Sequence, residues 1–239
     1  MKHGWEGVVL KLMRGKNFTL TVQAAEDLDD RYRRLSFNDG GMLGATGTHP
    51  TMWVRLWFDN AGTPHQRAYT LLDPNPSTGT FGMEFALHDG CASRWARAAR
   101  PGDTIEATVQ GTGFTVPDPL PSRLLVIGDP ASLPAINSLL DSMPLTPATI
   151  WFETPHPSDE QLPLRSGTAR HEVHHVPRRD NGALLIETVR SALPAHLDDG
   201  SYVWIACDTS TTRALTSFVR RQLGVPKERL HSMGYWRAT

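Results

Sequence analysis

The sequence contains few cysteines, no long apolar run and no excess of charge of either sign. Its two cysteines, Cys91 and Cys207, belong to no Cys-x-x-Cys pair and are too few for a disulfide framework. The N-terminal residues lack the apolar run of a signal peptide, and no segment approaches the roughly 20 apolar residues of a membrane span. With 24 basic and 25 acidic residues, the composition indicates neither a nucleic-acid nor a membrane partner. We therefore expect a cytoplasmic protein. We also expect a monomer.

The first half of the 239-residue chain predicts a β domain. Short segments rich in β-branched and aromatic residues recur with turn residues between them, which is typical of a sandwich or barrel. One helix, over residues 92–99, is predicted to interrupt the strands. The predicted strands cover residues 8–12, 18–22, 32–37, 52–58, 79–87 and 105–109.

The second half predicts an α/β domain that follows a proline-rich linker at residues 117–121. Strands at residues 123–127, 149–152, 172–176, 202–207 and 230–235 alternate with helices that begin at Ser132, an expected cap, or cover 183–193 and 211–223. This alternation indicates parallel βαβ units. Ligands of such sheets bind at the carboxyl ends of the strands, an edge that here carries Gly128-Asp129 and Cys207-Asp208.

The first candidate site is Arg67-Ala68-Tyr69-Thr70, at the end of a predicted strand. A guanidinium can bind a phosphate through two hydrogen bonds, a phenol ring can stack on a flat ring system, and a hydroxyl can hydrogen-bond a ring nitrogen or carbonyl. An ordinary edge strand with a tyrosine explains the same four residues, so the pattern alone leaves both interpretations open.

Three further segments carry candidate residues. Residues 88–96 pass from a strand into a helix, with His88, Ser93 and small residues that would let backbone N–H groups approach an anion. Residues 128–136 occupy a βα loop but lack the G-x-G-x-x-G fingerprint. The terminal Tyr235-Trp236-Arg237 could stack on a ring cofactor or anchor the core. A capped strand-turn-helix remains the alternative for residues 88–96.

Taken together and in this order, the segments resemble the siderophore-interacting proteins, a family of ferric-siderophore reductases built on the ferredoxin-reductase plan. The resemblance covers nearly the whole chain. It consists of R-x-Y-T (Arg67, Tyr69, Thr70), F-x-L-H (Phe85, Leu87, His88), A-S-x-W-A (Ala92, Ser93, Trp95, Ala96), P-G-D (101–103), G-D-x-x-x-L-P-A-I (128–136) and Y-W-R (235–237).

The resemblance implies an antiparallel Greek-key barrel that binds FAD, at residues 1–119, and a parallel α/β domain like those that bind NAD(P)H, at residues 120–239. It implies that basic side chains beside the flavin attract an anionic ferric siderophore, with Arg55, Arg237 and Arg123 as candidates. NADH, NADPH or reduced ferredoxin would donate the electrons. The implied FAD-binding residues are Arg67, Ala68, Tyr69, Thr70, Phe85, Leu87, His88, Ala92, Ser93, Trp95, Ala135, Tyr235 and Trp236.

Reduction of ferric to ferrous iron would weaken the binding of the iron to its hard oxygen ligands. Such electron transfer needs no catalytic acid, base or nucleophile. Two alternatives stay open: a general NAD(P)H:flavin or ferredoxin-type reductase, and a non-enzymatic flavin or siderophore binder. The histidines at residues 171–175 have no second ligand cluster, so we expect surface histidines and no metal site. The run Arg178-Arg179-Asp180 is expected to be a solvated loop.

Overall fold

The computed structural model describes residues 15–109, 113–167 and 170–237. The chain divides after Thr115 into two compact units, each with its own sheet. The strand predicted at residues 8–12 lies outside the described residues. Within the described part of the chain, no helix has the length and apolar character needed to cross a bilayer.

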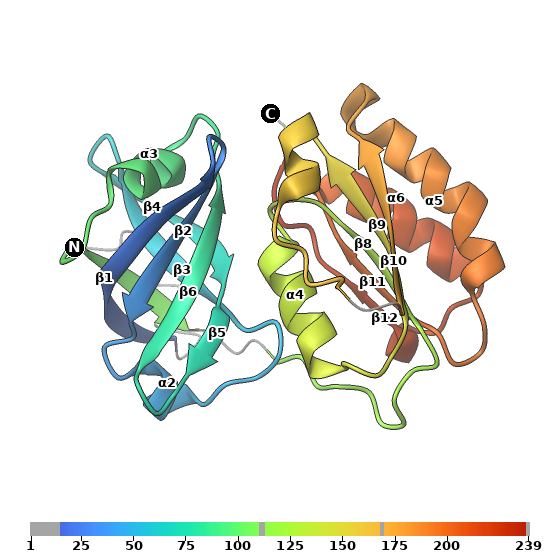
Figure 1. Ribbon diagram of the computed structural model, residues 1–239, viewed down its shortest axis with the longest axis horizontal. Coiled ribbons are helices and arrows are strands. Elements are labelled where there is room, and N and C mark those ends of the chain that lie inside the picture. Colours follow the sequence, from blue (N-terminus) through green and yellow to red (C-terminus); the bar gives the residue numbers. More distant parts are fainter. Residues whose placement is uncertain (1–14, 110–112, 168–169, 238–239) are drawn as a thin grey trace. The chain divides into compact units, whose positions relative to one another are not determined.

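Unit 1, residues 1–115, contains a seven-stranded antiparallel sheet in the order β4-β3-β7-β1-β2-β6-β5 (Figure 1). The sheet curls, so that the end of β4 approaches β6. The strands are β1 (Lys16–Asp29), β2 (Tyr32–Asn38), β3 (Trp53–Asn60), β4 (Thr63–Thr70), β5 (Leu72–Asn75), β6 (Thr80–Ala86) and β7 (Thr104–Val109), with helices α2 (Met42–Thr46) and α3 (Cys91–Ala98).

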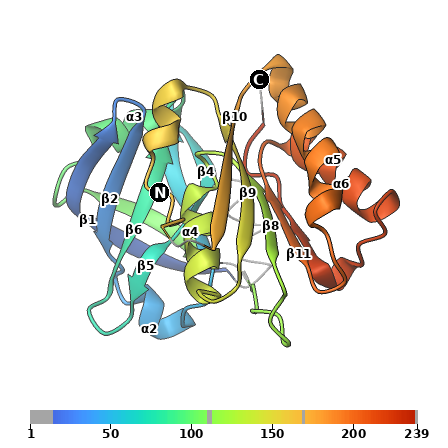
Figure 2. The same ribbon diagram turned by 45° about the vertical axis from the view of Figure 1, so that its right-hand side comes forward.

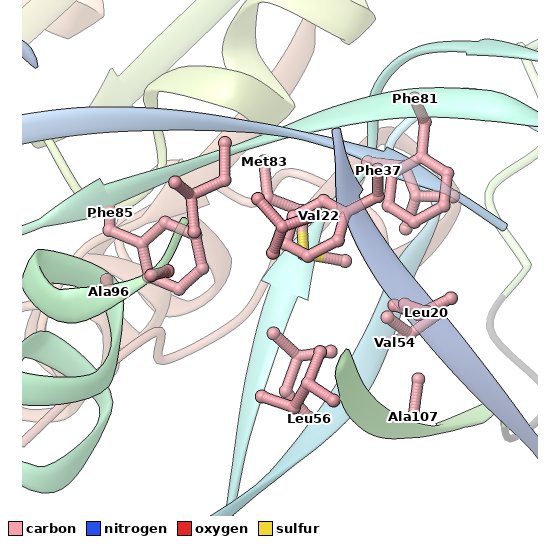
Figure 3. Packing of buried hydrophobic residues seen from close by; sticks show 14 of the residues in the cluster. Leu20, Val22, Phe37, Val54, Leu56, Phe81, Met83, Phe85, Ala96 and Ala107 are labelled. Carbon is pink, nitrogen blue, oxygen red and sulfur yellow. The ribbon is translucent and has the colours of Figure 1, made fainter. Parts of the chain in front are cut away.

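The core of unit 1 lies inside this curled sheet (Figure 3). Alternate residues of β3 point inward, so Val54 and Leu56 are fully buried while Arg55 between them is not. Helix α3 adds Ala92 and Ala96, which share one helical face. Each large apolar side chain buried here contributes roughly 1.5–3 kcal/mol, which is the main stabilisation of the barrel.

Unit 2, residues 116–239, contains a five-stranded parallel sheet in the order β10-β9-β8-β11-β12. The direction of strand addition reverses between β8 and β11, which is where open α/β sheets bind ligands. The strands are β8 (Leu124–Gly128), β9 (Ala148–Thr154), β10 (His171–Pro177), β11 (Tyr202–Ala206) and β12 (Leu230–Ser232), with helices α4 (Leu133–Ser142), α5 (Ala183–His196) and α6 (Thr209–Arg221).

The helices of unit 2 cover both faces of its sheet. Figures 1 and 2 show α4 on one face and the pair α5 and α6 on the other. Strands β8, β9 and β11 are consequently buried along their whole length, which explains why their sequences are continuous apolar runs.

The predicted fold class is confirmed: an antiparallel half-barrel precedes a parallel sheet with helices on both faces. Strand β5 and the short helix α2 were not predicted, because β5 contains Pro74 and α2 lies in a glycine-rich segment. Ser132 does occupy the first position before α4, but its side chain does not cap the helix. Its hydroxyl instead bonds the backbone N–H and carbonyl of Asp129, which fixes the loop after β8.

Candidate functional site

The end of β4 presents the first predicted site. Arg67 and Ala68 are exposed, whereas Tyr69 is partly buried and Thr70 is 5% exposed. The Arg67 guanidinium donates to the carbonyl of Gln66 at 2.8 Å, and no ion pair joins it to a carboxylate of the described residues. Arg67 therefore offers an unneutralised cation at the edge of the sheet. Burial raises the pKa of the Tyr69 phenol, so its ring stays neutral.

Aromatic side chains bring three of the predicted segments together. The Tyr69 ring lies 4.3 Å from that of Phe85 on β6, measured between ring centroids. Trp95 of α3 lies 6.2 Å from Phe85 and 5.8 Å from Phe58. The ends of β4 and β6 and the helix α3 thus share one aromatic cluster. Phe85 is fully buried in it and belongs to the core, as Leu87 and Ala92 do.

The N-terminus of α3 adjoins this cluster and has the features of an anion site. Gly90 precedes the helix, no side chain caps it, and its first turn contains no acidic residue. A Cβ at Gly90 would lie 3.0 Å from the ring of the exposed His88, so the backbone approaches this histidine closely. Ser93 is buried, and its hydroxyl accepts the backbone N–H of His88 at 3.1 Å. Among the residues that the structure describes, no acceptor side chain thus caps the positive end of the helix dipole.

Arg55 lies on the other face of the sheet from Tyr69. The two belong to neighbouring strands, but Tyr69 pairs with the inward-pointing Val54, whereas Arg55 pairs with Ala68. The Arg55 guanidinium stacks 4.6 Å from the ring of Trp53, and its Nη1 atom is buried without a hydrogen-bond partner among the described residues. Burial lowers the pKa of Arg55.

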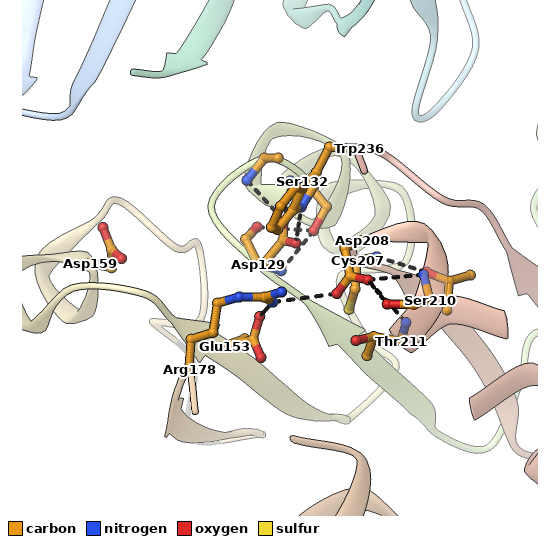
Figure 4. A network of polar contacts seen from close by, with 12 residues as sticks. Asp129, Ser132, Glu153, Asp159, Arg178, Cys207, Asp208, Ser210, Thr211 and Trp236 are labelled. Atoms are coloured by element: carbon orange, nitrogen blue, oxygen red, sulfur yellow. Dashed lines mark hydrogen bonds and ion pairs between the residues drawn. The ribbon is translucent and has the colours of Figure 1, made fainter. Parts of the chain in front are cut away.

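A second polar cluster lies in unit 2, at the carboxyl ends of β8, β9 and β11 (Figure 4). Asp129 follows β8 and is 1% exposed. Its carboxyl accepts hydrogen bonds from Trp236 Nε1 at 2.7 Å and from the backbone N–H groups of Ala131 and Ser132 at 2.9 and 3.2 Å. Burial raises the pKa of Asp129 to about 7, against the lowering effect of the Trp236 hydrogen bond.

Arg178 joins two more acidic residues in this cluster. Its guanidinium is ion-paired with Glu153, whose side chain is fully buried, and lies 3.3 Å from Asp208. Burial raises the pKa of Glu153, and Arg178 opposes that shift. Burial also acts on Asp208, but hydrogen bonds from Ser210 and Thr211 lower its pKa. The expected solvated loop is wrong for Arg178, whose side chain is 14% exposed, because the ends of β9 and β11 place the carboxylates of Glu153 and Asp208 against it.

The C-terminal segment crosses this cluster. The backbone carbonyl of Trp236 accepts from Thr209, and the Trp236 ring lies 4.8 Å beneath the Arg178 guanidinium. The Tyr235 backbone N–H donates to the carbonyl of Cys207, and its ring meets that of Trp204 edge-on. Trp236 therefore covers the edge of the sheet where β8 and β11 end.

The other predicted residues of unit 2 lie apart from one another. Ala135 is fully buried in α4. Arg123 precedes β8 at the amino end of the sheet and donates to Thr149 at 3.1 Å, whereas Arg237 is exposed and follows Trp236 at the carboxyl edge. The structure does not bring these two arginines together.

Glu153, Arg178 and Asp208 were not predicted as a cluster. One signal was available in the sequence, because Glu153 is a charged residue at the end of a continuous apolar strand. Such a residue needs a partner when it is buried. Among the described residues, no three histidine, cysteine, aspartate or glutamate side chains gather in the way that a metal ion requires.

The chain has a ferredoxin-reductase-like fold. It superposes on a ferredoxin-NADP⁺ reductase from Neisseria gonorrhoeae, solved with bound FAD and NADP, with a TM-score of 0.70 at 13% identity, covering 92% of this chain and 99% of that one. The family models give the finer assignment. Residues 16–110 match the siderophore-interacting FAD-binding domain, and residues 121–239 match the siderophore-interacting protein model. The chain belongs to the siderophore-interacting protein family.

The chain matches different shares of the length of two curated relatives. The mycobactin import ATP-binding/permease protein IrtA of Mycolicibacterium smegmatis is 34% identical over 99% of this chain, but only 28% of that protein is matched. The chain thus spans just over a quarter of the length of that relative. A ferric acinetobactin reductase of Acinetobacter baumannii is 24% identical over 79% of this chain and 67% of the relative.

Proposed function

We propose that this chain is an FAD-dependent ferric-siderophore reductase, which takes up a ferric siderophore and releases ferrous iron. The observation that carries the proposal is the meeting of the β4 end, the β6 end and the start of α3 around one aromatic cluster, in a chain of this family. The relative that reduces ferric acinetobactin supports the reaction. Ferrous iron binds hard oxygen ligands more weakly than ferric iron, so reduction labilises the complex.

The residues of unit 1 fit FAD. Arg67 pairs with no carboxylate of the described residues, and no side chain among them caps the start of α3, which follows Gly90 and the exposed His88. Arg67 and α3 would hold the phosphates, and Tyr69 would lie against the flavin ring. When bound, FAD supplies single electrons to the iron. In this arrangement Arg67, Tyr69 and α3 position the cofactor. Basic side chains that do not contact it can then attract an anionic substrate.

The electron donor that we propose is NADH, NADPH or reduced ferredoxin. The carboxyl edge of the unit 2 sheet, where a dinucleotide would bind in this fold, carries the carboxyl groups of Asp129, Glu153 and Asp208, and Arg178 already pairs with the last two of them. Carboxylates oppose the binding of a pyrophosphate. This favours a donor that does not bind through a pyrophosphate at that edge. We further propose that the chain acts as a cytoplasmic monomer.

The first experiment tests the cofactor. Purified protein is expected to be yellow or to take up FAD, with a flavin absorbance spectrum. The Arg67→Ala variant should bind FAD about tenfold more weakly, because it loses charge-assisted hydrogen bonds to phosphate. Arg31→Ala removes an exposed arginine of the same unit and should leave FAD affinity unchanged. A protein that stays colourless after FAD is added would refute the proposal.

The second experiment tests the substrate. With each donor in turn, ferrous iron release from several ferric siderophores is followed with a ferrous-specific chelating dye. The Arg55→Ala variant should slow release while the FAD content stays at that of the parent protein, since Arg55 lies on the other face of the sheet from Tyr69. Loss of FAD from this variant would show that Arg55 was wrongly assigned to the substrate. Equal turnover of free flavin and no preference for ferric siderophores would favour a general reductase.

A further inference from the structure

A groove of about 590 Å³ runs along α6, on the flank of unit 2 beside β12 (α6 is labelled in Figures 1 and 2). Its volume lies within the range of roughly 300–1,000 Å³ that is usual for small-molecule sites. Its lining combines hydroxyl and guanidinium groups and includes no acidic residue of the described chain. The lining residues are Thr209, Thr212, Arg213, Thr216, Ser217, Arg220, Arg221, Ser232 and Gly234.

The three arginines of the groove carry positive charge that the described residues do not neutralise. Arg213, Arg220 and Arg221 are exposed, and none of them has an ion pair within the described part of the chain. Elsewhere in unit 2, Arg165 is ion-paired with Asp141 and Arg178 with Glu153. The α6 groove is therefore a local concentration of unpaired cations in a chain whose net charge is only −1.

The hydroxyl groups of the groove differ in whether they have partners among the described residues. Thr209 donates to the Trp236 carbonyl and Thr212 accepts from the backbone N–H of Cys207, so both are engaged. The hydroxyl of Thr216, by contrast, is buried and has no hydrogen-bond partner in the described part of the chain. Since Arg213 and Arg220 are seven residues apart on α6, about 10 Å along the helix axis, Thr216 lies between them. The exposed guanidinium donors thus line the groove at intervals rather than at a single point.

We propose that this groove binds the phosphate groups of a nucleotide-sized ligand. Guanidinium and hydroxyl donors without a competing carboxylate are the chemistry that recognises phosphate, and arginine does so through paired hydrogen bonds. The separation of the two arginines suits two phosphate groups, or one phosphate and a second anionic group, better than a single small anion. The acidic carboxyl edge of the same sheet has the opposite charge character. The proposal does not depend on the redox activity of the chain.

Titration calorimetry of the full chain, saturated with FAD so that flavin sites are filled, tests the proposal with inorganic pyrophosphate and ADP as probes. Both probes are expected to bind, and the affinity should fall with rising salt concentration. Arg213→Ala and Arg220→Ala should each weaken binding by about tenfold, the loss expected for hydrogen bonds to a charged group. Lys227→Ala, which removes an exposed cation outside the groove, should leave the affinity unchanged.

Further measurements decide between the outcomes. Arg213→Lys keeps the charge but loses the paired geometry, so an affinity between those of the parent and Arg213→Ala supports guanidinium recognition. Failure of both probes to bind at millimolar concentration overturns the proposal, as does binding that neither arginine variant weakens. Co-sedimentation with anionic phospholipid vesicles, without binding of either soluble probe, also overturns it in favour of a lipid surface. Circular dichroism of each variant verifies that it is folded.

Discussion

Asp129 makes the stability of unit 2 depend on pH. Its carboxyl is fully buried after β8 and accepts from Trp236 Nε1 at 2.7 Å. Burial raises its pKa from 3.8 to about 7, the Trp236 hydrogen bond opposes this shift, and the nearby Glu153 adds to it. Between these two pKa values the folded chain therefore holds a proton at residue 129 that the unfolded chain has released.

The sign and size of the effect follow from this difference. Because the folded state binds more protons than the unfolded state between about pH 4 and pH 7, the free energy of unfolding decreases as pH rises through this window and levels off above it. At 1.36 kcal/mol per pKa unit, the whole window corresponds to roughly 4 kcal/mol. About 2.5 kcal/mol of this is lost between pH 5 and pH 8.

The Asp129→Asn variant tests this reasoning because its carboxamide cannot ionise. Its oxygen can still accept from Ala131 and Ser132, but its NH₂ group would face the Trp236 N–H, and two opposed donors cost about 1–3 kcal/mol. The variant should therefore be less stable than the parent at pH 5, and the difference should shrink or reverse by pH 8.

Urea unfolding at pH 5, 6, 7 and 8, followed by circular dichroism, measures the difference between the two proteins. Every other group titrates in both, so the change of this difference with pH isolates residue 129. Asp199→Asn, which changes an exposed carboxyl of the same unit, should show no comparable pH dependence. A stability difference that stays constant from pH 5 to pH 8 would refute the raised pKa of Asp129.

Two further predictions concern the same edge of the sheet and the two thiols. Arg178→Ala leaves the buried Glu153 without its cation, so it should lower the free energy of unfolding by about 3–5 kcal/mol and the Tm by roughly 10 °C. Arg179→Ala removes an exposed side chain and should have the Tm of the parent protein. Equal Tm values for the two variants would contradict a stabilising ion pair. Cys207 is fully buried, which raises its pKa, so only Cys91 should react with Ellman's reagent until the protein unfolds. Two thiols reacting equally fast in the folded protein would contradict this burial.

The sequence predicted the fold best where a residue pattern is compatible with only one kind of secondary structure and burial. The apolar runs at residues 124–127 and 202–207 have no polar face, and such runs fit strands covered on both sides, as β8 and β11 are. Strand β4 was predicted only at its end, because its exposed residues at an edge of the sheet show no apolar alternation. Its position depends on pairing with β3, which local sequence does not specify.

The candidate sites divide in the same way. The order of the family motifs predicted that Tyr69, Phe85 and Trp95 belong to one site, and their rings do lie together. Their contact with FAD stays a prediction. Arg178 was misjudged because a basic run after a strand is usually solvated. Only the parallel arrangement of β9 and β10, which brings the ends of two strands side by side, places the carboxylate of Glu153 against it.

Acidic and basic side chains of unit 2 gather in two different places. Their positions affect where an electron donor with phosphate groups could bind. The carboxyl edge holds three acidic residues, two of them paired with Arg178 and the third with Trp236, whereas the α6 groove holds three arginines and no acidic residue of the described chain. A dinucleotide that bound at the carboxyl edge would have to displace Trp236 from Asp129 and place its phosphates beside carboxylates. If NAD(P)H nevertheless proves to be the donor, Asp129→Asn should tighten its binding at pH 8, where the parent carboxyl is ionised. Ferredoxin-driven turnover should not respond to that substitution.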